Sequence, residues 1–213
     1  LHPQAVMTSA YNTEDENSRR MKQTGLPILY NIEWQEKSIL GRAEWIKFVG
    51  ALFDKEALAD SIFGRIAKQY NEVKKSAEKF SYAPSILSGQ DYRGTWSMPG
   101  GRSYSAQLFR DAGANYYYAN DTTASGSISS SIEEALIHFN QADIWVGVQA
   151  NTLEELGRMD SKYKLFKSYK DGNVYHINKR ANATGGNDYW ESGVARPDLL
   201  LSDMIKIVHP TLL

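Results

Sequence analysis

The sequence predicts an α/β fold in which two lobes, each with a largely parallel sheet covered by helices, are joined by one long helix. Short apolar segments of strand length alternate with amphipathic segments along the 213 residues, as in parallel sheets covered on both faces. An uninterrupted helical pattern runs from residue 54 to residue 80 between two such series. We therefore expect residues 1–53 to form the second half of an N-terminal lobe, residues 54–80 the connecting helix and residues 81–213 the C-terminal lobe.

The long helix is predicted by apolar side chains that recur in steps of three and four from Leu58 to Phe80. Asp54 suits the N-cap, and Glu56 and Lys74 lie where the helix dipole favours an acidic and a basic side chain, respectively. At ~1.5 Å per residue, such a helix spans roughly 40 Å, about the width of a domain. That length is typical of a strut between two bodies; the alternatives are an ordinary amphipathic core helix and one half of a helical hairpin.

The part before this helix has the order strand, helix, glycine, strand. Residues 4–9 are expected to form a strand, and the polar residues 13–23 a helix that ends at Gly25. Residues 26–32 are a second strand, with its proline near the first position, where a missing amide is tolerated. This order is typical of a βαβ unit. Residues 41–53 are expected to form one further helix.

The part after the long helix repeats the alternation. Strands are expected at 84–88, 115–119, 143–148 and 173–177, helices at 103–112, 132–139, 152–159 and 198–208, and loops at 89–104 and 121–131. Ser131 and Glu134 have the spacing of a capping box at the start of the helix 132–139.

Composition excludes several classes of function. The 24 Lys and Arg residues balance 25 Asp and Glu residues, so no basic surface for nucleic acid is expected. Cysteine is absent, which excludes disulfides and a thiol nucleophile within these residues. No apolar run approaches the ~20 residues that span a bilayer. The first ten residues resemble the middle of a domain and carry no signal-peptide pattern, so we expect the native N-terminus to lie upstream.

Signatures of catalysis and of metal binding are absent. The sequence contains no phosphate-binding loop, no dinucleotide-binding glycine pattern, no G-x-S-x-G and no H-E-x-x-H. The four histidines are scattered without ligand spacing. We therefore expect no metal held by protein ligands alone; we also expect no catalytic residues and no resident cofactor.

Two segments that follow predicted strands are rich in aromatic and cationic side chains. Ligands of open α/β sheets bind beyond the carboxyl ends of strands, and Tyr, Trp and Arg suit a flat, partly anionic molecule. The candidate ligand-binding residues are Tyr92, Arg93, Trp96, Arg102, Arg180, Tyr189 and Trp190. The alternative is that Trp96 and Trp190 fill the ends of the sheet and that the arginines are solvated.

Four segments resemble a known family, the substrate-binding proteins of ABC importers for iron-siderophores, haem and cobalamin. They are LHPQAVMTSAY, in which Gln4 replaces the usual Asp, GLPILYNIEW, SSIEEALIHFNQADIWV, and the terminal GGNDYWESGVARPDLLLSDMIKIVHP, where Arg196 and Pro197 open the last helix. Their order, with the long helix between them, covers nearly the whole chain. The resemblance implies the chelatase-like, class III periplasmic binding protein fold, with an incomplete N-terminal lobe.

The resemblance also implies a function without catalysis. The protein would bind a small-molecule metal chelate or corrinoid between its lobes, with little closure, and hand it to the membrane permease subunits of an ABC transporter. In the family, one glutamate on each lobe docks on the permease; the C-lobe glutamate corresponds to Glu134, with Glu133 as the neighbouring alternative. A periplasmic or outward-facing monomer is implied, with tethering as a lipoprotein through an upstream anchor.

Two other functions remain as alternatives. A two-lobed enzyme of the chelatase or nitrogenase-component type would need acid–base or metal-ligand residues in the cleft, for which Glu191, Asp188 and His176 are candidates without forming a recognised set. A surface interaction module without a small-molecule ligand is the third hypothesis.

Overall fold

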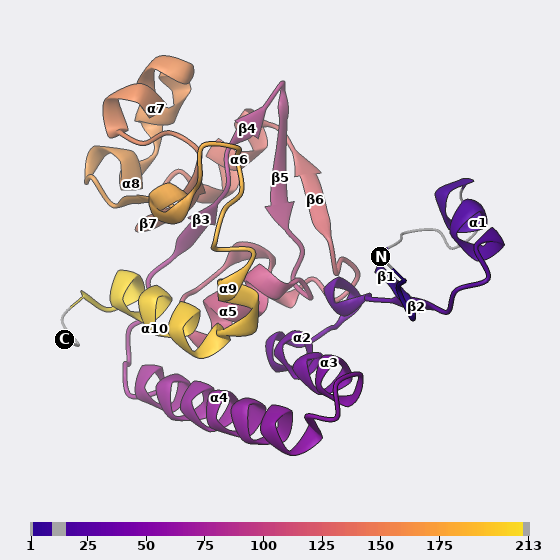
Figure 1. The fold of residues 1–213 in the computed structure, drawn as a ribbon. Coiled ribbons are helices and arrows are strands. Elements are labelled where there is room, and N and C mark those ends of the chain that lie inside the picture. The colour runs from indigo at the N-terminus through magenta and orange to yellow at the C-terminus, as the bar shows by residue number, and fades with distance from the viewer. Residues whose placement is uncertain (1, 10–15, 211–213) are drawn as a thin grey trace. The chain divides into compact units, whose positions relative to one another are not determined.

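The computed structural model describes residues 2–9 and 16–210 (Figure 1). Contacts between residues divide it into two compact units, one up to Glu36 and one from Lys37 onwards. In the described part of the chain, no helix is both long enough and apolar enough to cross a bilayer.

The first unit contains the predicted βαβ unit. Strands β1 (Val6–Thr8) and β2 (Ile28–Tyr30) pair in parallel, with Val6 opposite Ile28. Helix α1 (Glu16–Gln23) lies between them in the sequence and is followed by Gly25, whose φ of 72° only glycine adopts readily. Strand, helix and strand are confirmed. Both strands are shorter than predicted, and residues 13–15 of the predicted helix lie outside the described residues.

The second unit begins with two short helices where one was predicted over residues 41–53. Ser38 caps α2 (Ile39–Glu44) by accepting a hydrogen bond from the Gly41 amide. Helix α3 (Ile46–Ala51) follows after Trp45, whose amide donates to the Arg42 carbonyl and so departs from the i→i−4 pattern. The chain then turns at Asp54, which has a φ of 52°.

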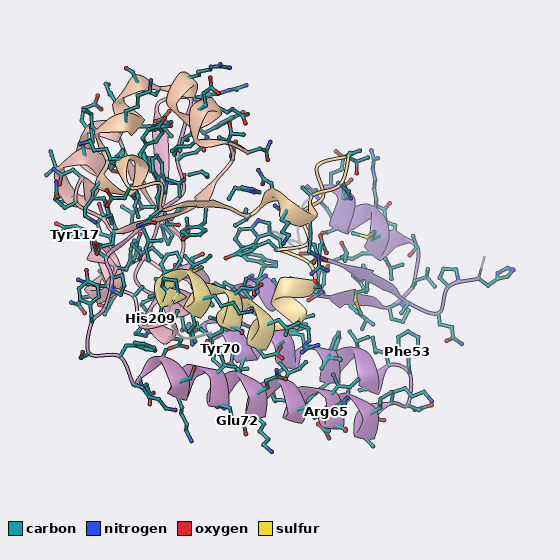
Figure 2. The ribbon with its side chains drawn as sticks, turned by 90° about the vertical axis from the view of Figure 1, so that its left-hand side faces the viewer. Phe53, Arg65, Tyr70, Glu72, Tyr117 and His209 are labelled. Carbon is teal, nitrogen blue, oxygen red and sulfur yellow. The ribbon has the colours of Figure 1, made fainter. Side chains whose placement is uncertain are left out.

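The long helix is confirmed as one continuous element, α4 (Glu56–Ala77). Asp54 is not its N-cap, because Asp54 lies in the left-handed turn and the capping position is Lys55. Figure 2 shows Tyr70 pointing into the unit, whereas Glu72 and Arg65 point away from it.

Helix α4 lies within the second unit and packs against α3 and the last helix, α10 (Pro197–Val208). Gly50 of α3 approaches Ala59 of α4 so closely that a Cβ at Gly50 would lie 2.7 Å from the Ala59 Cβ. This packing places residues 37–53 with the long helix and not with the first two strands. Lobe boundaries at residues 53 and 80 therefore differ from the compact units and stay a prediction.

A parallel sheet with the order β3-β7-β8 forms the centre of the second unit. Its strands are β3 (Ile86–Ser88), β7 (Ile144–Val148) and β8 (Val174–His176), all at predicted positions. The strand predicted at 115–119 is wrong: Asn115 makes a single bridge to Ser85, and a 3-10 helix, η2 (Tyr117–Asn120), follows. Tyr116 turns into the core, where its hydroxyl donates to the Pro99 carbonyl at 2.7 Å.

A second, antiparallel sheet lies where loops were predicted. It consists of β4 (Asp91–Tyr92), β5 (Thr95–Pro99) and β6 (Ser127–Ser130). Arg93 and Gly94 both have positive φ, 55° and 84°, as in a type I′ hairpin turn. The loop prediction for 89–104 was therefore wrong. This glycine-rich segment contains the hairpin of β4 and β5.

The remaining helices of the second unit are α5 (Tyr104–Asp111), α6 (Ile132–Phe139), α7 (Leu153–Met159), α8 (Lys167–Lys170) and α9 (Ser192–Ala195), with the 3-10 helices η3 (Ser161–Leu165) and η4 (Asn178–Arg180). Helices α5 and α6 contact β5, and α8 contacts β7. The first unit also contains the 3-10 helix η1 (Glu33–Gln35). The capping box at Ser131 and Glu134 is confirmed, with both reciprocal hydrogen bonds formed.

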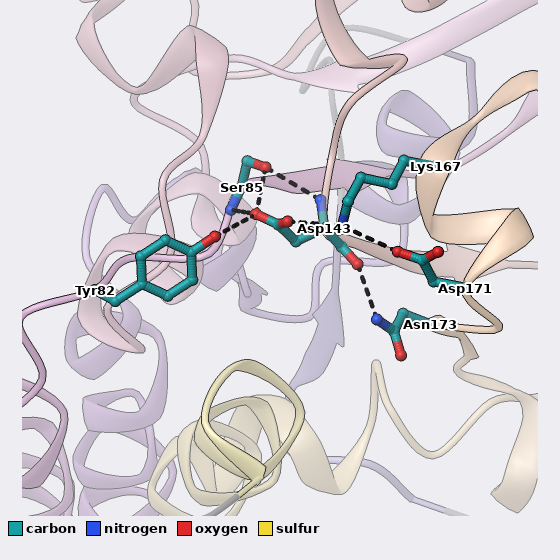
Figure 3. Close-up of polar contacts among 6 residues, drawn as sticks. All are labelled: Tyr82, Ser85, Asp143, Lys167, Asp171 and Asn173. Atoms are coloured by element: carbon teal, nitrogen blue, oxygen red, sulfur yellow. Dashed lines mark hydrogen bonds and ion pairs between the residues drawn. The ribbon is translucent and has the colours of Figure 1, made fainter.

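The amino end of the parallel sheet is fixed by Asp143, just before β7 (Figure 3). One carboxylate oxygen accepts from the Ser85 amide at 2.9 Å and from the Tyr82 hydroxyl at 3.0 Å, and the other lies 3.0 Å from the Lys167 Nζ. Burial alone would raise the pKa of Asp143, but these hydrogen bonds outweigh it and hold the pKa at about 2. Asp143 therefore connects β3, β7 and α8.

Candidate functional site

A cavity of about 540 Å³ lies in the second unit, between strands β7 and β8, the segment after β8, and α10. Its lining consists of Val146, Gly147, Tyr175, His176, Ile177, Lys179, Arg180, Asp188, Tyr189, Ser192, Gly193, Arg196, Leu199, Leu200, Asp203, Met204 and Ile207. Its size lies within the range of pockets for small molecules. The carboxyl ends of β7 and β8 meet at this site, as expected for a ligand site of a parallel sheet.

One wall of the cavity is apolar and comes from α10. Leu200, Met204 and Ile207 follow one another at helical spacing and line the cavity together with Leu199. Each is a large aliphatic or thioether side chain, so this wall offers a ligand dispersion contacts and few hydrogen bonds.

Tyr189 supplies an aromatic face. It is half-buried, and its ring meets that of Trp190 edge-on, with centroids 4.6 Å apart and an interplanar angle of 81°. Burial raises the pKa of the Tyr189 phenol above its ordinary value. The pair presents a rigid apolar body with two polar handles.

Charged groups occur mostly as pairs at the cavity. The Arg180 Nη2 lies 2.7 Å from Asp188 Oδ2, which also accepts from the Ser192 hydroxyl at 2.6 Å. Arg196 donates to both carboxylate oxygens of the fully buried Asp198, at 2.9 and 2.7 Å. The bidentate pair fixes Arg196 at the start of α10.

Hydrogen bonds from amide groups hold the start of the segment after β8 against the ends of the neighbouring strands. The Asn178 side chain donates to the Gln149 carbonyl at 2.7 Å, and the Gln149 amide donates to the buried Gln90 side chain at 2.8 Å. These bonds connect the carboxyl ends of β3, β7 and β8. They position Lys179 and Arg180, which follow directly, at the cavity.

Of the seven predicted ligand residues, Arg180 and Tyr189 line the cavity, and Trp190 packs on Tyr189 while half exposed. Tyr92 and Arg93 occupy the β4–β5 turn, where the Arg93 guanidinium lies 5.1 Å from the Tyr92 ring centre. Neither lines the cavity.

Arg102 and Trp96 also lie outside the cavity. Arg102 donates to the Thr122 carbonyl at 3.3 Å. The prediction for Trp96 is wrong: its side chain is fully buried, packs against Trp145, and donates its Nε1 hydrogen to the Ser88 carbonyl at 2.8 Å. Trp96 therefore belongs to the core beneath the sheet ends, which was the stated alternative.

Lys179 and Arg196 line the cavity but were not predicted as ligand residues. Lys179 adjoins Arg180 in the same segment, and the apolar spacing of the last helix indicated a face that needs a partner. The position of Lys179 beside Arg180 and the apolar face of the last helix were both visible in the sequence. Among the enzyme candidates, His176 and Asp188 line the cavity; His176 Nδ1 accepts from the Asn178 amide at 3.1 Å. In the described residues, no group of three His, Cys, Asp or Glu side chains is placed to hold a metal.

Both predicted docking glutamates are exposed at the start of α6. Glu133 lies 2.6 Å from the Lys162 Nζ, and this hydrogen bond lowers the pKa of Glu133. Glu134 accepts from the Ser131 amide at 3.2 Å and from the Ser130 hydroxyl at 3.0 Å, so it caps the helix. Docking by either residue stays a prediction.

Residues 2–181 match the protein family described as periplasmic binding protein. The chain belongs to this family. The predicted resemblance and the predicted α/β fold class are thereby confirmed, and the family places the protein outside the cytoplasm.

The chain is also similar to curated proteins of an archaeon. Two uncharacterized lipoproteins of Methanocaldococcus jannaschii are each 24% identical to the chain, over 99% and 100% of it and 49% and 54% of their own length. The chain thus spans about half the length of these relatives.

Solved structures share the fold at low sequence identity. A possible iron-binding periplasmic solute-binding protein from Staphylococcus epidermidis has a TM-score of 0.73 at 14% identity, covering 97% of this chain and 76% of that one. An ABC transporter substrate-binding protein from Listeria monocytogenes has a TM-score of 0.68 at 18% identity, with coverages of 98% and 78%. IsdE of S. aureus, solved with haem, has a TM-score of 0.63 at 19% identity, with coverages of 94% and 75%.

Proposed function

We propose that the protein is the extracytoplasmic solute-binding component of an ABC importer and binds its cargo without transforming it. The observation that supports this most is the cavity at the carboxyl ends of β7 and β8 in a chain of the periplasmic binding protein family. A lipid anchor, as the names of the M. jannaschii relatives state for those proteins, would keep it at the membrane.

The proposed cargo is an iron chelate, haem or a corrinoid. Similar structures are described as iron-binding or were solved with haem. The cavity supports such a cargo with an apolar wall from α10 and an aromatic face at Tyr189, both suited to a flat or bulky organic ligand. Arg180 and Trp190 are proposed as further contacts at the rim.

Transfer to the permease is proposed to use the start of α6. Glu134, or Glu133 beside it, would meet a cationic pocket of the membrane subunit. Their exposure supports this role, because a carboxylate can serve as a helix cap and still present its second oxygen to a partner.

Ligand titration tests the proposal. The full-length protein is titrated with ferric chelates, haem and cyanocobalamin while its tryptophan fluorescence is followed, since Trp190 lies beside the cavity. Saturable binding of at least one of these, with the ligand recovered unchanged, is expected. Chemical conversion of a bound ligand would favour the enzyme alternative, and absence of binding to all of them would favour the interaction module.

A further inference from the structure

The charged side chains that line the cavity nearly cancel one another. The cationic ones are Lys179, Arg180 and Arg196, and the carboxylates are Asp188 and Asp203. The sequence alone predicted a flat, partly anionic ligand contacted by aromatic and cationic side chains. The pairing observed in the structure limits how much negative charge that ligand can carry.

Both arginines at the cavity are neutralised by the protein itself. Arg180 lies 2.7 Å from Asp188, and Arg196 forms two hydrogen bonds with Asp198, whose side chain is fully buried. The exposed Arg180 guanidinium still has N–H groups that can donate to a ligand anion, but its charge is already balanced by Asp188. Drawing Arg196 away from Asp198 would leave a buried carboxylate without its partner, which is strongly unfavourable.

Lys179 differs from the two arginines. Its side chain is exposed, and it has no ion-pair partner among residues 2–9 and 16–210. An ammonium on a flexible stem can reach a ligand group at the cavity mouth without breaking an existing pair. Asp203, exposed on α10 and 3.9 Å from the Lys206 Nζ, adds negative charge on the other side.

Burial of a charge in an apolar pocket is costly unless an opposite charge compensates for it. From this balance we infer that the cavity selects a largely apolar cargo carrying at most about one net negative charge, and that Lys179 is the residue that meets this charge. The inference rests on the proposed function and narrows its cargo. Highly anionic chelates are disfavoured, because among the described residues that line the cavity only Lys179 is a cation without an ion-pair partner.

The test compares ligands of different charge on the unmodified protein. Cyanocobalamin and an uncharged ferric trihydroxamate are set against ferric haem, which is close to singly anionic, and a triply anionic ferric tris-catecholate. The tightest ligand is expected to be one of the first three, with the tris-catecholate at least tenfold weaker. If the tris-catecholate binds most tightly, the inference is overturned and the proposed function stands. If none binds, both fail.

Exposed charge variants test the role of Lys179. Lys179→Gln is expected to weaken haem binding by about tenfold and to leave any binding of the uncharged ligands unchanged. Asp203→Asn, which removes a negative charge, is expected to strengthen tris-catecholate binding. Lys75→Gln on the exposed side of α4 is the matched control and is expected to change nothing. The assignment of Lys179 would be contradicted if Lys179→Gln lost the same affinity for haem and for the uncharged ligands. It would also be contradicted if the affinity for neither changed.

Discussion

Lys74 of α4 and Asp111 of α5 form an ion pair in which the carboxylate is almost completely buried. The Lys74 Nζ lies 2.9 Å from one carboxylate oxygen, and the Tyr70 hydroxyl donates to the other at 2.7 Å. Helix α4 is therefore attached to α5 by a buried ion pair as well as by apolar contacts. Breaking one side of such a pair leaves a buried charge unmatched.

Removal of this charge network tests how α4 is anchored. Lys74→Met should destabilise the fold by about 3 kcal/mol, because Asp111 would remain buried with only the tyrosine as partner. Tyr70→Phe should cost about 1–2 kcal/mol through loss of one hydrogen bond to a charged group. Urea unfolding measures both. Equal and negligible effects would show that the network does not hold the helix.

Acid should weaken the Asp143 junction. The pKa of Asp143 is depressed to about 2 in the folded protein, from 3.8. Its contribution is therefore fully present above about pH 4 and is lost as the pH falls towards 2. A shift of this size corresponds to about 2 kcal/mol. In Asp143→Asn, the free energy of unfolding should differ less between pH 5 and pH 2.5 than in the unmodified protein. Denaturant unfolding at both pH values measures this difference. An unchanged pH dependence would contradict the role of Asp143.

His209 should make stability depend on pH in a higher range. The His209 side chain, labelled in Figure 2, is buried. Its ring stacks on that of Phe80 with centroids 4.0 Å apart. Burial lowers the pKa of His209, opposed only in part by the Ala112 carbonyl. The unfolded chain therefore takes up a proton first, and stability should fall as the pH drops below about 6.5.

The variant His209→Phe keeps an aromatic ring beside Phe80 and cannot titrate. Its stability should vary less between pH 7 and pH 5 than that of the unmodified protein, as followed by thermal unfolding. A slope that persists in His209→Phe would assign the pH dependence to other groups.

The two tryptophans predicted as ligand residues should behave in opposite ways. Trp96→Ala should destabilise the protein by about 3–5 kcal/mol, because Trp96 is fully buried among aromatic rings. Trp190→Ala should change stability by about 1 kcal/mol or less, because half of its side chain is exposed. Ligand affinity should fall in Trp190→Ala. Unchanged affinity would remove Trp190 from the site.

Docking and helix capping by Glu134 can be separated by two substitutions. Glu134→Ala should lose about 1 kcal/mol of stability with the capping box, whereas Glu134→Gln retains hydrogen-bonding capacity at that position. Both should leave ligand affinity unchanged and impair uptake through the permease. Uptake that survives Glu134→Gln would mean that its charge is not used, and Glu133→Gln would then be examined in the same way.

Periodicity predicted the elements whose signals are local. Apolar spacing predicted the long helix and the strands β3, β7 and β8. Residue types at a helix start predicted the capping box at Ser131. The hairpin at Arg93 and Gly94 was missed because a short, glycine-rich strand pair resembles a loop in composition. The strand prediction at 115–119 was wrong. Consecutive tyrosines have strand propensity, but the Tyr116 side chain packs in the core and the backbone continues as a 3-10 helix.

The site was predictable in location but only partly in its residues. The rule that ligands bind at the carboxyl ends of strands led to Arg180 and Tyr189. It could not separate them from Trp96, because burial depends on packing between elements far apart in the chain. The pairing of Arg180 with Asp188 and of Arg196 with Asp198 likewise depends on three-dimensional positions.

Capture of a cargo without chemistry can be tested by native mass spectrometry of the full-length protein after incubation with the chelates, haem and cyanocobalamin in competition. One retained molecule per chain, released with unchanged mass, is expected. A protein that retains none of them, or releases an altered one, would contradict it.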